Sequence, residues 1–148
     1  MSEPATPATS TPPPPQANAA VAAVASAARW FWWIAGLSLV NTVLVQTGND
    51  MNFVVGLGIT AGADALFAGT KVIGFIVDAV AIVFFVLMGL QAQRGKLWAF
   101  YVGIGVYTLD ALIYAAIQDW MPVAFHALII YFIVRGAMLL RAMKRATA

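Results

Sequence analysis

Apolar segments of about twenty residues alternate with short polar segments along most of this sequence. The apolar segments occupy residues 30–47, 71–90, 97–118 and 123–140. None of them contains more than two acidic, basic or histidine residues. Because a helix rises about 1.5 Å per residue, each is long enough to cross a hydrocarbon core about 30 Å thick. The pattern predicts an all-α membrane protein with a bundle of four transmembrane helices.

A fifth segment, Asn52–Gly69, is also apolar but short, and it contains Asp64 and four glycines. Asn52, Thr60 and Asp64 are spaced by eight and four residues, which places them on one narrow polar face of a helix. Such a face is typical of a helix that lies at the membrane surface. We therefore expect segment 52–69 to be an interfacial or re-entrant helix, with a fifth span as the alternative.

The positions of the basic residues favour four spans. Lys71 would lie alone on the outer side of a four-span chain whose termini are both cytoplasmic. The inner side would then hold six basic residues: Arg29, Arg94, Lys96, Arg141, Lys144 and Arg145. Five spans would place five basic residues inside and two outside, which fits the positive-inside rule less well.

The N-terminal region has a different character from the rest. Residues 1–16 are rich in Pro, Thr and Ser, and Ala17–Ala28 is almost entirely Ala and Val. Proline-rich sequence does not pack into a core, so we expect residues 1–28 to be a disordered tail and residues 29–148 to be the bundle. The Ala/Val stretch is alternatively an extension of the first helix, because Ala has a high helix propensity.

Composition supports a lipid environment. Hydrophobic residues make up 62% of the 148 residues and charged residues only 9%, against about 25% charged in soluble domains. The absence of cysteine excludes disulfides, thiolate metal sites and iron–sulfur clusters. The net charge of +2 comes mostly from residues at helix ends, so it indicates membrane topology and no nucleic-acid partner.

Several large polar side chains are expected at the lipid interface. Trp30, Trp32, Trp33 and Trp98 fall at the predicted inner surface and Trp120 at the outer one, where amphipathic rings prefer to lie. Arg135 is expected to reach lipid phosphates from inside the last helix. The basic end, which comprises Arg141, Lys144 and Arg145, is expected to orient the chain and contact anionic lipid.

Four polar residues are predicted at one depth in the membrane: Asn41, Asp78, Asp110 and His126. Counting from the outer helix ends places each about 9 to 12 Å below the surface. Asp110 and His126 should touch, because their helices form an antiparallel hairpin. Tyr107 and Tyr114, at i−3 and i+4 from Asp110, share its helix face.

This polar layer has two interpretations that the residues leave open. It is a proton relay or a site for a cation or polar solute, or it is a clamp that fixes helix packing. A metal site is disfavoured because there is no His pair at ligand spacing, and we expect no cofactor. No motif indicates a nucleophilic enzyme, since Ser38 lacks a G-x-S-x-G context.

Two stretches resemble sequences of known proteins: RWFWWIAGLSLVN (Arg29–Asn41) and NFVVGLGIT (Asn52–Thr60). They are similar to patterns in small, uncharacterised bacterial integral membrane proteins with about four transmembrane helices. The resemblance covers about a quarter of the chain and implies a bacterial inner membrane, without implying any activity.

Three functions follow as hypotheses. The first is a non-enzymatic bundle that assembles with itself or with a membrane-protein partner. The second is an oligomeric channel or proton-coupled transporter that uses Asp78, Asp110 and His126. The third is an intramembrane enzyme with an Asp–His acid/base pair. Four short helices enclose little volume, so the second and third would need an oligomer or an interhelical cavity.

Overall fold

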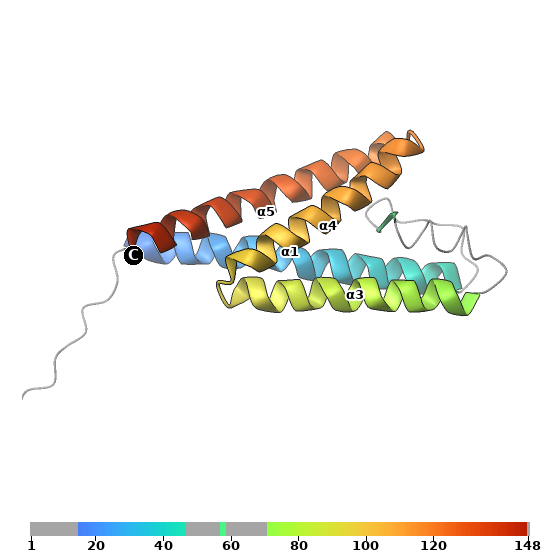
Figure 1. Ribbon diagram of the computed structural model, residues 1–148, viewed down its shortest axis with the longest axis horizontal. Coiled ribbons are helices and arrows are strands. Elements are labelled where there is room, and N and C mark those ends of the chain that lie inside the picture. The colour runs from blue at the N-terminus through green and yellow to red at the C-terminus, as the bar shows by residue number, and fades with distance from the viewer. Residues whose placement is uncertain (1–14, 47–56, 59–70, 148) are drawn as a thin grey trace, which may run out of the picture.

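The computed structural model describes residues 15–46, 57–58 and 71–147 of the chain. This part contains four long helices and no strand. They are α1 (Pro15–Gln46), α3 (Lys71–Gln93), α4 (Leu97–Ala116) and α5 (Trp120–Ala146), shown in Figure 1. All four are long and apolar enough to cross a membrane, which confirms the predicted four-helix architecture.

The helix boundaries differ from the predicted ones mainly at the two ends of the chain. α1 begins at Pro15, well before the predicted boundary at residue 29, so Ala17–Ala28 extends the first helix and is not part of a disordered tail. Proline is suited to a first helical position because the missing N–H has no intrahelical partner there. At the other end, α5 continues through the basic residues to Ala146. Lys144 and Arg145 in its last turn favour this extension, since they lie at the negative end of the helix dipole.

The helices form two antiparallel pairs. α1 packs against α3, α4 packs against α5, and further contacts between α1 and α5 and between α3 and α4 close the bundle. The pairs lie together at the end that holds the α3–α4 turn and diverge toward the α4–α5 turn (Figure 1). Phe31 of α1, Phe85 of α3 and Phe100 of α4 meet in the core, with ring centroids 6.0 to 6.4 Å from Phe31.

Two glycines allow the helices to approach closely. A Cβ atom at Gly103 of α4 would overlap the ring of Phe31, and a Cβ atom at Gly136 of α5 would overlap Ala27 of α1. Gly103 and the buried Ala99 are four residues apart, a small-xxx-small spacing that lets helix backbones approach in lipid. The first helix therefore packs against small residues of both α4 and α5.

The α3–α4 turn and the α4–α5 turn end the preceding helix in the same way. After α3, Gly95 has a φ of 69°, and the N–H groups of Gly95 and Lys96 donate to the carbonyls of Ala92 and Gln91. These bonds define a Schellman cap.

After α4, Gln118 has a φ of 60°. The N–H groups of Gln118 and Asp119 donate to Ala115 and Tyr114 in the same pattern. A side chain with a Cβ is less favourable than glycine in this left-handed conformation.

The expected interfacial helix over residues 52–69 lies outside the described residues, apart from Leu57 and Gly58. These two residues are buried near the wide end of the bundle (Figure 1). A Cβ atom at Gly58 would lie 2.9 Å from Tyr114 Cε2, so the backbone passes directly against α4 there.

Candidate functional site

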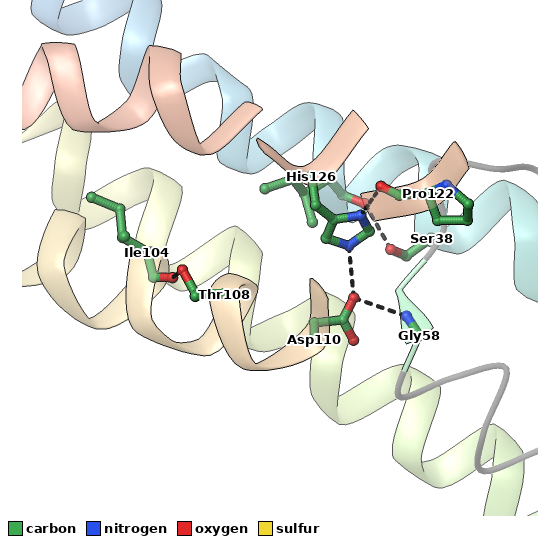
Figure 2. Close-up of polar contacts among 8 residues, drawn as sticks. Ser38, Gly58, Ile104, Thr108, Asp110, Pro122 and His126 are labelled. Atoms are coloured by element: carbon green, nitrogen blue, oxygen red, sulfur yellow. Dashed lines mark hydrogen bonds and ion pairs between the residues drawn. The ribbon is translucent and has the colours of Figure 1, made fainter. Parts of the chain in front are cut away.

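Asp110 of α4 and His126 of α5 form a buried pair across the second helix hairpin. His126 Nε2 lies 2.8 Å from Asp110 Oδ2, and the residues are 0% and 4% exposed. The sequence predicted this contact, because an antiparallel hairpin brings the two positions to the same depth. It is drawn in Figure 2.

Asp110 also receives a hydrogen bond from outside its own hairpin. The backbone N–H of Gly58 donates to Asp110 Oδ2 over 2.8 Å, so one carboxyl oxygen contacts both residues (Figure 2). The absence of a side chain at Gly58 allows this approach, since Tyr114 occupies the space a Cβ would need. The Asp110 cluster, defined as Asp110, His126 and Gly58, thus joins three separate parts of the chain.

The other nitrogen of the imidazole determines how many protons this cluster holds. His126 Nδ1 lies 2.8 Å from the carbonyl oxygen of Pro122, which can only accept a hydrogen bond, so Nδ1 carries a proton. One further proton lies between Nε2 and Oδ2, on the imidazole or on the carboxyl group. The Asp110–His126 pair has no net charge in either arrangement, which lowers the cost of burying it.

Two tyrosines of α4 surround the imidazole. The ring of Tyr107 stacks on His126 with centroids 4.3 Å apart and planes at 19°, and the ring of Tyr114 lies 5.4 Å away at 54°. Both rings lie on the Asp110 face of α4, as their spacing predicted. The hydroxyl of Tyr107 is buried and has no hydrogen-bond partner within the described part of the chain.

A second polar contact joins the first helix pair. Thr42 Oγ1 of α1 lies 2.7 Å from Asp78 Oδ2 of α3, and Asp78 is 1% exposed. Thr42 Oγ1 also lies 3.1 Å from the carbonyl oxygen of Ser38, and Ser38 Oγ donates to the carbonyl of Ile34. A hydroxyl has one proton to donate, so Thr42 Oγ1 donates to Asp78 Oδ2, the shorter contact, or shares its proton with the carbonyl of Ser38.

Three members of the predicted polar layer take part in two distinct contacts: Asp110 with His126, and Asp78 with Thr42. All four of its members are buried: Asn41, Asp78, Asp110 and His126. Thr42 and Gly58, which the sequence did not single out, complete the contacts together with Ser38, which the sequence analysis considered only as a nucleophile. The i, i+4 spacing of Ser38 and Thr42 could have indicated a polar face on α1. The backbone N–H of Gly58 has no side chain, so no sequence pattern could have indicated its contact with Asp110.

The surroundings of Asp110 are apolar. A groove of about 420 Å³ between α3 and α4 reaches this residue, and all its other lining side chains are hydrocarbon or aromatic, including Val80, Phe84 and Leu109. Across the described ranges, no three His, Asp or Glu side chains are close enough together to hold a metal ion. The arrangement can share a proton or fix a backbone segment.

The residues expected at the lipid interface lie at different levels of the helices, since Trp30, Trp32 and Trp33 are near the middle of α1 and Arg135 is near the middle of α5. Trp32 and Trp33 of α1 line a groove with Gln93, beside the α3–α4 turn, and Trp98 lies in the first turn of α4. Trp120 begins α5 at the opposite end. Trp30 is half-buried and stacks on Phe132, so packing as well as anchoring holds this ring.

Comparisons with family models, curated proteins and solved structures gave no match. The four long apolar helices indicate a membrane protein on their own. They agree with the four-helix architecture that the sequence resemblance implied.

Proposed function

We propose that the protein is a non-enzymatic membrane bundle in which the Asp110 cluster is a structural clamp. The observation that carries this proposal is the double role of Asp110 Oδ2, which meets both Gly58 N–H and His126 Nε2 at 2.8 Å. A clamp requires buried polar groups that satisfy one another across separate segments, and this cluster has that property. The apolar lining of the adjoining groove supports a dry site.

We further propose that the bundle assembles with itself or with a membrane-protein partner through the outer face of α1. Gly36 on this face has no atom within 4 Å of the position its Cβ would take. It lies in a surface groove of about 440 Å³ together with Arg29, Trp32 and Trp33. Small residues beside a groove allow another helix to approach closely in lipid.

Disulfide cross-linking tests self-assembly, because the chain has no native cysteine. Gly36→Cys should give an oxidant-dependent dimer in native membranes. Leu112→Cys, on an exposed position of α4, is the matched control and should stay monomeric. Equal cross-linking at both positions, or none at position 36, would argue against self-assembly through this face.

A proton relay is the second candidate. Two observations favour it: His126 Nε2 and Asp110 Oδ2 lie 2.8 Å apart and can share a proton, and the nearby Tyr107 hydroxyl is buried without a partner among the described residues. Such groups are the components of intramembrane proton pathways. A relay would make the protein an oligomeric channel or proton-coupled transporter.

Proteoliposomes separate the two candidates. A clamp predicts that wild-type protein dissipates a pH gradient no faster than empty liposomes. Flux that is present in wild type and lost in a folded Asp110→Asn variant would replace the clamp with the relay. Asp119→Asn is the matched control, because Asp119 is exposed in the α4–α5 turn.

For the location, we propose a bacterial inner membrane with both termini cytoplasmic. The concentration of basic residues supports this orientation, since Arg94, Lys96 and the basic end of α5 all lie toward the same end of the bundle (Figure 1). The sequence resemblance supports the bacterial membrane.

A further inference from the structure

A groove runs along the outer surface between α1 and α5. It has a volume of about 450 Å³ and lies at the end of the bundle where α1 begins and α5 ends. Its lining includes Ala23, Ser26 and Ala27 from α1 and Gly136 and Leu139 from α5. Because most of these side chains are small, the two helix backbones approach closely at Ala27 and Gly136 and leave an open, mostly apolar groove above their contact.

Aromatic rings define one end of this α1–α5 groove. Trp30 and Phe132 both line it, and they stack with centroids 5.4 Å apart and planes at 9°. Ala23 is seven residues before Trp30, so the groove extends about 10 Å along the helix axis. Because α1 begins at this end of the bundle, Ala23 lies nearer to that end and the aromatic pair lies farther from it.

A cation lies at the edge of the same groove. Arg135 lines it, is exposed, and belongs to the membrane-spanning part of α5. Its Cζ atom is 5.8 Å from the ring centroid of Tyr131. The ion pair found among the described residues is that of Asp110 with His126, so no carboxylate in this part of the chain neutralises Arg135.

A guanidinium on a lipid-facing surface that has no carboxylate partner among the described residues favours an anion from its surroundings. A phosphodiester is the anion that a bilayer supplies, and it matches the forked donors of arginine. Three more basic residues follow on α5 toward the same end: Arg141, Lys144 and Arg145. Their field favours a headgroup with a net negative charge over a zwitterionic one.

We propose that the α1–α5 groove binds one anionic phospholipid. The lipid phosphate pairs with the Arg135 guanidinium, and one acyl chain lies over Ala27 and Gly136 as far as the Trp30–Phe132 pair. This inference is independent of the Asp110 cluster and of the assembly proposed above.

Native mass spectrometry of the detergent-solubilised full chain tests the site with two probes, phosphatidylglycerol and phosphatidylcholine. Wild type should retain phosphatidylglycerol at lower lipid concentration. Arg135→Gln should weaken its binding about tenfold, which corresponds to the loss of a charge-assisted hydrogen bond. Arg135→Lys should keep the preference for phosphatidylglycerol with reduced affinity, because lysine retains the positive charge but lacks the paired N–H donors of the guanidinium.

Two further variants locate the binding. Ala23→Leu places a larger side chain at an exposed position in the groove and should weaken binding of both lipids. Arg141→Gln removes a cation outside the groove lining and should change affinity by less than about threefold, as expected for a screened surface charge. Undiminished phosphatidylglycerol binding by folded Arg135→Gln, or an equal loss in Arg141→Gln, would overturn the proposal.

Discussion

His126 Nε2 and Asp110 Oδ2 lie 2.8 Å apart although the two residues are 16 positions apart in the chain. The contact crosses the α4–α5 hairpin, and Pro122 O on the opposite side of the imidazole sets its orientation. Because Gly58 N–H reaches the same carboxyl oxygen, a change at either member of the pair also affects a segment far away in the sequence.

Removing one member of the Asp110–His126 pair should destabilise the protein strongly. Asp110→Leu leaves the imidazole Nε2 and the Gly58 N–H without their hydrogen-bond partner, which should lower the free energy of unfolding by about 3 to 5 kcal/mol. The double variant Asp110→Leu/His126→Leu should cost clearly less than the sum of its single variants, because it leaves no unpaired ionisable group. Unfolding titrations in mixed detergent micelles provide the double-mutant cycle. Additive single effects would show that the contact contributes nothing to stability.

Asp110→Asn should also destabilise the cluster, by about 1 to 3 kcal/mol. When the shared proton lies on Asp110, Oδ2 can accept from Gly58 N–H and donate to the imidazole at the same atom. An amide oxygen cannot donate and an amide nitrogen cannot accept. At this position Asn therefore bonds either to the Gly58 N–H or to Nε2 of a neutral His126, but not to both. Thermal melting of this variant beside Asp119→Asn measures the difference, and equal melting temperatures would contradict the hydrogen-bond assignment.

Tyr107→Phe should leave the stability unchanged or raise it by up to about 1 kcal/mol. The ring stacking on His126 is retained, and the substitution removes a buried hydroxyl without a partner in the described part of the chain. Tyr107→Leu is the comparison and should destabilise, because it removes the aromatic contacts with His126 and Phe85. A marked loss of stability in Tyr107→Phe would reveal a hydrogen bond to the hydroxyl in the membrane.

Gly103→Ala should destabilise the bundle by about 1 to 3 kcal/mol, because the added methyl group would overlap Phe31 in the core. Gly105→Ala is the matched control on the same helix. Gly105 is exposed with nothing within 4 Å of its Cβ position, so alanine should be neutral or stabilise α4 slightly. Thermal melting of both variants in detergent checks the contrast. An equal response would mean that α1 and α4 are not in contact at Phe31.

Gln118→Gly should raise the free energy of unfolding by up to about 1 kcal/mol, because it relieves a left-handed conformation that is unfavourable for a residue with a Cβ. Gly95→Ala at the other cap should lower it by about 1 to 2 kcal/mol for the same reason. Steric overlap does not add to the cost at Gly95, since the closest atom lies 4.0 Å from the position of the added Cβ. Detergent unfolding curves compare the caps, and destabilisation by Gln118→Gly would contradict this account.

Single cysteines at the two turns should report the orientation of the chain. Gln93 and Asp119 are exposed at opposite ends of the bundle. In whole cells, an impermeant thiol reagent should label Asp119→Cys and leave Gln93→Cys unlabelled until the membrane is disrupted. The reverse pattern would place the basic end of the bundle outside.

The sequence alone determined the four long helices of the described part of the chain, their approximate positions and the level at which Asp110 and His126 face each other in one hairpin. The length of an apolar segment is a local property, and the constant rise of a helix converts residue number into depth. For this reason the Asp110–His126 contact and the face shared by Tyr107 and Tyr114 could be predicted. The start of α1 was misjudged, because low-complexity Ala/Val sequence before a span is compatible with helix or with an unpacked tail.

Only the tertiary structure decided which groups at that depth meet. Asn41 and Thr42 are adjacent in the sequence and lie at nearly the same depth, so depth alone does not predict which of them meets Asp78. Successive residues on a helix point about 100° apart, and the rotation of α1 against α3 turns Thr42 toward Asp78. The Gly58 N–H that reaches Asp110 belongs to the backbone and has no side-chain pattern. Likewise, the groove beside Arg135 depends on how closely Ala27 and Gly136 approach, which is a property of two packed helices and of neither sequence segment alone.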